Sequence, residues 1–230
     1  MNLWDPFNPI AYFLHTVLGV SGIIGAFVAL SVTKGTTPHV MAGRVFGFAA
    51  AVAAGTAILF SFSNFAPMAI ASSALTISAV GSAVLALRTR SARVTAGEIF
   101  AAALMALVLI WLLFGAVLAA RQGGLLWIPP LVLAGMAACL LVSDILFLRQ
   151  PDAGRRLQRI KRHLSRMSFA LAIVIQAPIV VFADKLNIHP GLAFYGPLVL
   201  WPAIAIPMTV RLTKNLTVIA DRRNPGPARH

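Results

Sequence analysis

Apolar runs of about 20 residues recur along the whole chain, and they constrain its fold more than any other feature. We count seven, at residues 9–33, 39–62, 67–88, 96–120, 127–148, 165–184 and 191–213. Each run is long enough to cross a hydrocarbon core of about 30 Å as an α-helix. The chain is 59% hydrophobic and only 11% charged, which is more apolar surface than a soluble core can bury. The sequence therefore predicts an all-α, polytopic membrane helix bundle with seven transmembrane helices, forming a single domain at residues 1–213.

The basic residues predict how this bundle is oriented. Of the 19 Lys and Arg residues, all but Arg121 and Lys185 fall on one side of the predicted helices. Because Lys- and Arg-rich loops stay in the cytoplasm, we expect the N-terminus outside and the C-terminus inside, with a basic cytoplasmic tail at 214–230. The net charge of +13 then indicates contact with anionic lipid head groups rather than with nucleic acid.

The turn between the first two runs contains the first candidate site residue. Thr37 can cap a helix and Pro38 suits its first turn, so we expect His39 at the start of the second helix. Mostly small residues follow His39 on one face at helical spacing, and membrane helices meet at such faces. These residues are Gly43, Phe46, Gly47, Ala50 and Ala54. His39 should therefore point toward protein, as a ligand, a proton carrier or a hydrogen-bonded cap.

Three more histidines are candidates, and with His39 they form two predicted levels, one near each face of the membrane. His15 shares a face with Gly19 and Gly22, and an intramembrane histidine needs a partner. It is therefore a functional candidate, or else a packing residue bonded to a hydroxyl or carbonyl group. His15 and His189 belong to the outer level, and His39 and His163 to the inner one. For His189 the alternative is an ordinary surface histidine.

Two carboxylates lie in or near the apolar runs. Asp144 sits one turn from the inner end of the fifth helix, where a charge needs a partner. The candidate partners are His39, Arg44, His163 and Arg166. A salt bridge to arginine is one interpretation, and a metal site formed by His39, His163 and Asp144 is the other. Glu98 follows Thr95 at the spacing of a capping box, which accounts for it without chemistry.

The segment 149–166 is the most basic of the chain. Apolar residues recur in it every three or four positions, which predicts an amphipathic helix on the cytoplasmic surface, with most of its arginines on lipid phosphates. His163 and Arg166 are the exceptions because they lie where the chain enters the bilayer. In the last run, Pro197, Pro202 and Pro207 predict repeated kinks.

Short motifs resemble those of a known family. They are His15, Lys34-Gly35 followed by His39-x3-Gly43-Arg44, and His163-x2-Arg166-Met167. Around them the chain resembles a family of bacterial multi-pass membrane proteins catalogued as domain of unknown function 2306. The resemblance covers the first two helices and the start of the sixth. It implies a multi-helix protein of the bacterial cytoplasmic (inner) membrane with recurrent histidines and no established activity.

Three functions are compatible with these residues. The first is electron transfer by b-type haem or a metal on His39 and His163, with a second pair at His15 and His189. In that case Arg44 and Arg166 would hold haem propionates, and a quinone or another redox partner would exchange electrons. The second is a non-catalytic membrane subunit or a scaffold for anionic lipids, which would allow an oligomer. The third is a small proton-coupled transporter.

The redox hypothesis predicts a coloured protein. Detergent-purified protein should show a Soret band in its visible absorption spectrum, and His39→Ala or His163→Ala should remove it because each deletes an axial imidazole. A colourless and metal-free preparation would exclude this hypothesis.

Overall fold

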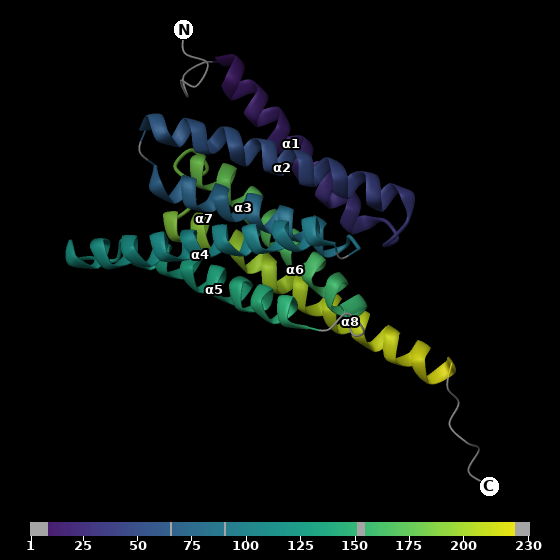
Figure 1. Cartoon of the computed structure of the whole chain (residues 1–230). Helices are drawn as coiled ribbons and strands as arrows, with labels where there is room; N and C mark the ends of the chain where they lie inside the picture. The colour runs from purple at the N-terminus through teal and green to yellow at the C-terminus, as the bar shows by residue number, and fades with distance from the viewer. Residues whose placement is uncertain (1–8, 65, 90, 151–154, 224–230) are drawn as a thin grey trace.

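The structure, a computed structural model, describes residues 9–64, 66–89, 91–150 and 155–223, and within these ranges the chain is helical and has no strand (Figure 1). Seven of the helical spans are long and apolar enough to cross a membrane. The all-α class and the number of spans are thus as predicted, and the chain is a multi-pass membrane helix bundle.

The helices follow the predicted runs closely. Their bounds are α1 Pro9–Ser31, α2 Thr37–Asn64, α3 Pro67–Ala86, α4 Ala92–Arg121, α5 Ile128–Arg149, α6 Arg155–Val181, α7 Pro190–Tyr195, the 3-10 turn η2 Pro197–Val199 and α8 Leu200–Arg223. The main differences are at α6, which begins well before the expected residue 165, and at α8, which continues into the segment assigned to the tail. Residues 224–230 of that tail lie outside the described part.

Local sequence explains where the helices begin. Helix α2 begins at Thr37 with Pro38 in its first turn, as predicted. The predicted capping box at α4 is wrong. Ser91 is the N-cap of that helix, and its side chain accepts a hydrogen bond from the Val94 N–H at 3.2 Å. Thr95 and Glu98 are consequently inside the helix, and Glu98 needs another explanation.

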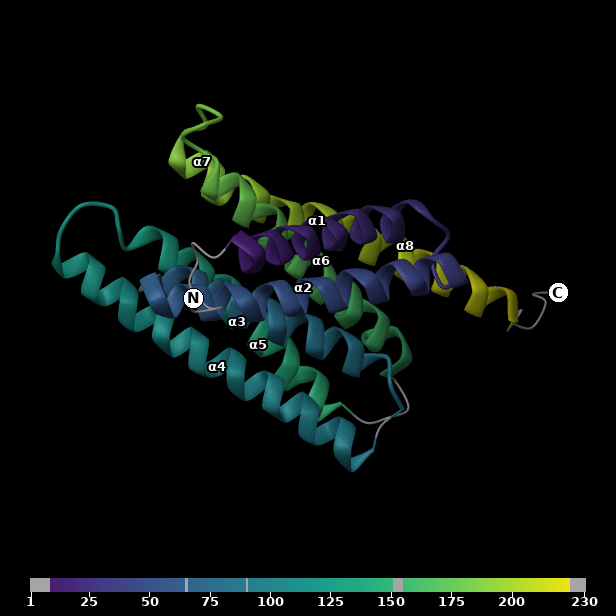
Figure 2. The same cartoon turned by 90° about the horizontal axis from the view of Figure 1, so that it is seen from above.

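Helix α6 is the centre of the bundle. Helices α1 to α4 each pack against the next helix in sequence, whereas α5 makes only a small contact with α6. Helix α6 contacts most of the others, namely α1, α2, α3, α5, α7, η2 and α8. Figures 1 and 2 show that the start of α1 and the end of α8 lie at opposite ends of the bundle, as an odd number of spans requires. We call the end that carries Lys34, Arg88, Arg149 and the start of α6 the basic end.

The prolines of the last run break it once. The chain changes from α7 to η2 at Pro197, which cannot donate a backbone hydrogen bond. Pro202 and Pro207 lie within α8, so the repeated interruption is confirmed at only one of the three positions. Gln176 of α6 donates from Nε2 to the Phe194 carbonyl at 3.0 Å and so ties α7 to the central helix.

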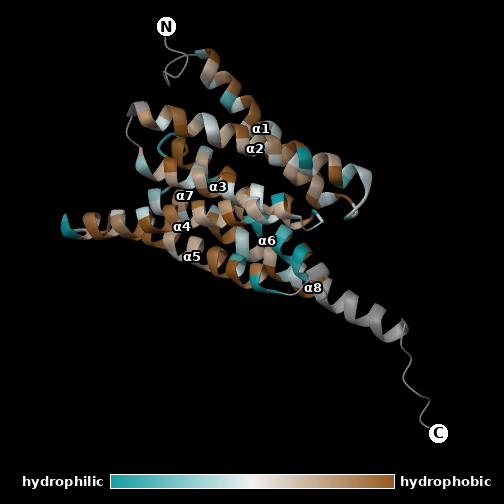
Figure 3. Ribbon diagram, viewed as in Figure 1, coloured by the Kyte–Doolittle hydropathy of each residue, from teal (hydrophilic) through white to brown (hydrophobic). Residues whose placement is uncertain are grey.

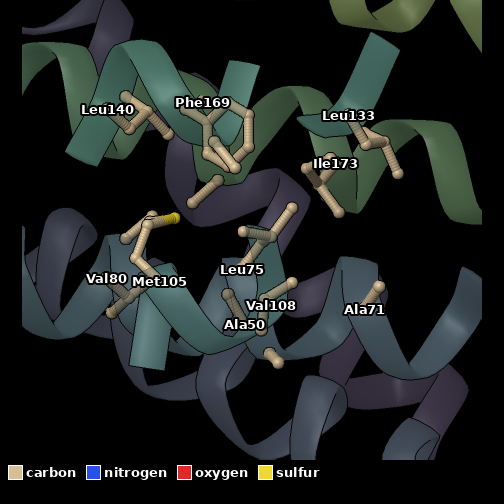
Figure 4. Packing of buried hydrophobic residues seen from close by; sticks show 14 of the residues in the cluster. Ala50, Ala71, Leu75, Val80, Met105, Val108, Leu133, Leu140, Phe169 and Ile173 are labelled. Carbon is tan, nitrogen blue, oxygen red and sulfur yellow. The ribbon is translucent and has the colours of Figure 1, made fainter. Parts of the chain in front are cut away.

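The core consists of small and aliphatic side chains packed around α6 and α3. Leu75, Met105, Leu133 and Phe169 are fully buried and come from four different helices (Figure 4). The large apolar side chains of the outer helix faces are exposed instead, and Figure 3 shows hydrophobic colour along the outside of the spans, as expected where lipid is the solvent.

A glycine allows α1 and α2 to approach closely. A Cβ added at Gly25 would lie 3.1 Å from both the Ala42 carbonyl oxygen and the Phe46 backbone nitrogen. These atoms are backbone and cannot rotate away, so the close contact requires glycine. At Gly19 of the same helix, an added Cβ would meet nothing within 4 Å.

This contrast makes a matched pair of substitutions. Gly25→Ala should lower the free energy of unfolding in detergent by about 1–3 kcal/mol, the usual cost of overpacking, because α1 must move away from α2. Gly19→Ala should cost nothing measurable. Equal stabilities of the two variants would show that Gly25 is not a close-packing position.

Candidate functional site

A cavity of 460 Å³ lies at the basic end between α1, α2, α6 and α8. Its walls are largely apolar, and its polar lining consists of Lys34, His39, His163, Ser168 and Arg211. The two imidazoles come from separate helices yet line one space, so their predicted convergence is confirmed. Their role as ligands stays a prediction.

His39 caps the end of α1. Its Nδ1 lies 3.0 Å from the carbonyl oxygen of Ala29, in the last turn of that helix. A carbonyl oxygen only accepts, so Nδ1 carries the proton and donates. Lys34 completes the cap, because its ammonium donates to the carbonyls of Ala29 at 2.8 Å and Leu30 at 2.6 Å. Nδ1 of His39 thus forms the hydrogen-bonded cap that was one of the predicted roles, and Nε2 takes no part in this cap.

His163 repeats this arrangement on α3. Its Nδ1 lies 3.1 Å from the carbonyl oxygen of Ala83, again in the last turn of a neighbouring helix. The last carbonyls of a helix have no partner within it and carry partial negative charge, so an imidazole N–H is a suitable donor there. Both histidines therefore hold the same tautomer, with Nδ1 used in the fold.

The cavity has a cationic character. Its described lining contains no Asp or Glu, whereas Lys34 and Arg211 both carry positive charge. Removal of water by the surrounding protein lowers the pKa of the Lys34 ammonium from its ordinary value. Lys34 and Arg211 were not predicted as site residues from the sequence. The spacing of Ile204, Met208 and Arg211 places them on one helix face and could have indicated Arg211.

The two arginines expected to hold haem propionates are elsewhere. Arg44 is exposed on α2 and does not line the cavity, because it follows Gly43 on the adjacent face of the helix. Arg166 is buried, pairs with Asp144 and does not line the cavity. The propionate contacts of the haem hypothesis therefore have no support in this geometry.

The outer pair of histidines is not brought into this cavity. His15 packs against α2, with Nδ1 2.8 Å from the Thr56 hydroxyl oxygen, so the hydroxyl-bonded packing alternative is confirmed. His189 is exposed, and its Nδ1 accepts from the Gly191 N–H at 3.2 Å as the N-cap of α7. It is the surface histidine that the alternative interpretation described.

A buried ion network joins α4, α5 and α6. Asp144 Oδ1 accepts from Arg162 Nε at 2.9 Å and from Arg166 Nη2 at 2.6 Å. Arg162 Nη1 reaches Glu98 Oε1 at 2.9 Å, and Arg166 also donates to the Leu140 carbonyl. The four charged residues are 0–4% exposed. Two positive and two negative charges cancel, which is what burial away from water requires.

This network confirms one prediction and corrects two. The salt bridge between Asp144 and Arg166 is confirmed. Arg162 was expected on lipid phosphates, but the early start of α6 places it one turn before Arg166 on the same inward face. Glu98 was expected to cap α4 and instead pairs with Arg162.

The predicted metal site is not assembled. Asp144 is bonded to two guanidinium groups and lies outside the cavity that contains His39 and His163. Within the part of the chain that the structure describes, no three His, Cys, Asp or Glu residues are grouped to hold a metal ion. Asp144 is therefore a structural counter-ion here and not a partner of the two imidazoles.

Comparison with known proteins adds no relative to this picture. The chain matches no protein-family model, no curated protein and no solved structure. The fold and the cavity thus define a class, a multi-pass helix bundle with a cationic pocket, and the function is argued from the site alone.

The ion network should dominate the stability of the bundle. Asp144→Ala leaves the buried Arg166 guanidinium without its counter-ion, and Arg162 keeps only Glu98. It should cost about 3–5 kcal/mol of unfolding free energy in detergent. Arg149→Ala removes an exposed charge from the end of the same helix and should change the stability by less than about 0.5 kcal/mol. A loss at Asp144 no larger than at Arg149 would contradict the role assigned to the network.

Proposed function

We propose that this chain binds a membrane amphiphile with an acidic head group in the cavity at the basic end. The observation that carries the proposal is one cavity with an apolar wall and a cationic polar lining at the end of the membrane spans. Lys34 and Arg211 attract the head group, and Phe46, Leu171 and Ile204 receive the hydrocarbon body. Its volume of 460 Å³ falls within the range of about 300–1,000 Å³ of sites for one small molecule.

The proposal includes the cellular setting. We place the protein in the bacterial inner membrane with its N-terminus outside and its C-terminus inside, because nearly all basic residues then face the cytoplasm. The basic end and its cavity lie at the cytoplasmic leaflet in this orientation. The anionic lipids of that leaflet attract basic side chains, so molecules with acidic head groups are abundant where the cavity lies.

Several residues of the motifs quoted for the family resemblance lie together in the structure. Lys34, His39, Gly43, His163 and Met167 come from motifs far apart in the sequence and line the same cavity. The resemblance to domain of unknown function 2306 stays a prediction. The motif residues His15, Arg44 and Arg166 lie outside the cavity, and Arg166 belongs to the ion network.

Haem b bound by His39 and His163 is the second candidate. One observation favours it, because a ligating imidazole usually donates its other ring N–H to a carbonyl, as both histidines do here. The propionate partners expected from the sequence do not line the cavity, so we rank it below amphiphile binding. The absorption spectrum decides between the two.

Transport by a path through Asp144, His39 and Gln176 has less support. Gln176 bonds to the Phe194 carbonyl, Asp144 is neutralised by arginines, and His39 lines the cavity. These side chains lie in separate environments.

A substitution that fills the cavity tests the proposal. A Cβ added at Gly43 would meet no heavy atom within 4 Å, so Gly43→Leu should fold normally and occupy the space of the amphiphile. Native mass spectrometry of protein equilibrated with oleic acid and phosphatidylglycerol should show at least about tenfold less bound amphiphile than wild type, equivalent to roughly 1.4 kcal/mol.

Gly55→Leu is the matched control. Gly55 lies on the same helix, is also free of neighbours within 4 Å of an added Cβ, and does not line the cavity. This variant should retain both amphiphiles as the wild type does. Retention that is equal in the Gly43 and Gly55 variants, or absent from the wild type, would reject amphiphile binding in this cavity.

A further inference from the structure

The donors of the cavity are mostly used by the fold itself. The Lys34 ammonium lies 2.8, 2.6 and 3.4 Å from the carbonyl oxygens of Ala29, Leu30 and Val32, which takes up its three N–H groups. The Ser168 hydroxyl donates to the Leu164 carbonyl at 2.8 Å. Both groups line the cavity, but neither has a proton left for an occupant.

The two imidazoles present acceptors instead. Each uses Nδ1–H on a helix-end carbonyl, at 3.0 Å for His39 and 3.1 Å for His163. In a neutral imidazole with a protonated Nδ1, the other nitrogen carries a lone pair. The two Nε2 atoms and the Ser168 oxygen therefore form an acceptor-rich lining. Among the described lining residues, Arg211 is the remaining donor, and it is exposed.

This combination of acceptors and positive charge selects the head group. A phosphodiester is a permanent anion without an acid proton, so it can pair with Arg211 but leaves both Nε2 acceptors without a donor. An ester or other head without an O–H offers nothing to the Nε2 atoms. A carboxylic acid brings its own proton for Nε2, and the field of Lys34 and Arg211 stabilises the carboxylate once the proton has moved.

We infer that the cavity takes a single-chain carboxylic acid whose acid proton is bound by Nε2 of His39 or His163, an inference that rests on the amphiphile binding proposed above. The proton leaves the carboxyl O–H and forms an N–H bond at Nε2, so an imidazolium and a carboxylate result and no other bond changes. One hydrocarbon chain fits a cavity of 460 Å³, which is a volume typical of a site for one small molecule.

The charges around the two imidazoles are consistent with this pairing. Helices α1 and α3 present the carbonyls of Ala29 and Ala83, and Lys34 and Arg211 come from the loop before α2 and from α8. Arg44 on α2 is exposed and outside the cavity. The ion network of Glu98, Asp144, Arg162 and Arg166 does not line the cavity and is neutral as a unit. No described carboxylate competes with the occupant for an imidazolium.

Three probes separate the head groups. For detergent-purified wild-type protein, we expect oleic acid to bind at least about tenfold more tightly than methyl oleate and phosphatidylglycerol, because tenfold is the effect of one good charge-assisted hydrogen bond. Isothermal titration calorimetry or native mass spectrometry measures the three affinities. Methyl oleate that binds as tightly as the acid would overturn the inference.

Two substitutions at each histidine separate the cap from the acceptor. His→Asn places an amide N–H where Nδ1–H was, so His39→Asn and His163→Asn keep the bonds to Ala29 and Ala83 and lose the acceptor. His→Gln places an amide oxygen near the Nε2 position and loses the cap. We expect the double Asn variant to keep the wild-type unfolding temperature and to bind oleic acid at least about tenfold more weakly. The double Gln variant should unfold at a lower temperature than the wild type and bind oleic acid more tightly than the double Asn variant does.

Proton uptake gives an independent readout. At neutral pH and above, the free fatty acid is ionised in water, so binding it together with one acid proton takes up one proton from solution. The affinity for oleic acid should then fall by up to about tenfold from pH 7 to pH 8, and this dependence should be absent from the double Asn variant. A pH dependence identical in both proteins belongs to the micelle and would overturn the inference.

The possible results of these experiments distinguish failure of this inference from failure of the proposed function. If phosphatidylglycerol binds in place of oleic acid and Gly43→Leu removes it, the cavity binds amphiphiles and the inference about the carboxylic acid is wrong. If no probe binds to the wild type, both are wrong. If the double Asn variant binds oleic acid as the wild type does, the imidazole acceptors are not its partners.

Discussion

The structure depends on the neutral ion network buried between α4, α5 and α6. Charges inside a membrane protein are tolerated only when they are paired, and here two carboxylates meet two guanidinium groups within 2.6–2.9 Å. Because Arg162 and Arg166 are one turn apart, their pairing also fixes the rotation of α6 about its own axis. That rotation also sets which residues of α6 line the cavity, His163 and Met167 among them. The network thus positions the site without contributing a ligand to it.

The two cavity histidines show how a fold and a binding site can share one side chain. One ring nitrogen of His39 or His163 donates to a carbonyl in the last turn of α1 or α3, and Lys34 shares the one on α1. The bond fixes the tautomer and the orientation of the ring, so the second nitrogen of each cavity-lining imidazole has a defined chemical character. Precise placement of this kind is what a recognition site needs, since little ordering remains to be done when an occupant arrives.

Prediction from the sequence succeeded where the solvent decides the structure and was partial where side chains meet. The spans followed from apolar length, and the pairing of Asp144 with Arg166 followed from the cost of an isolated charge in lipid. Arg162 and Glu98 were misassigned because a basic amphipathic segment and a Thr-x-x-Glu spacing both have common local explanations. The partners that overrule those explanations lie 18 and 64 residues away in sequence.

The sequence by itself determined the number of helices, their approximate limits and the residues with a chemical role to fill, since hydropathy and charge act within one helix length. The tertiary structure alone decided which of those residues meet. It separated Arg44 and Arg166 from the histidines, placed Lys34 and Arg211 beside them, and assigned one nitrogen of each imidazole to a neighbouring helix end. The physical reason is that these choices depend on the rotation of packed helices relative to one another, and helix rotation is fixed by contacts between distant segments rather than by local pattern.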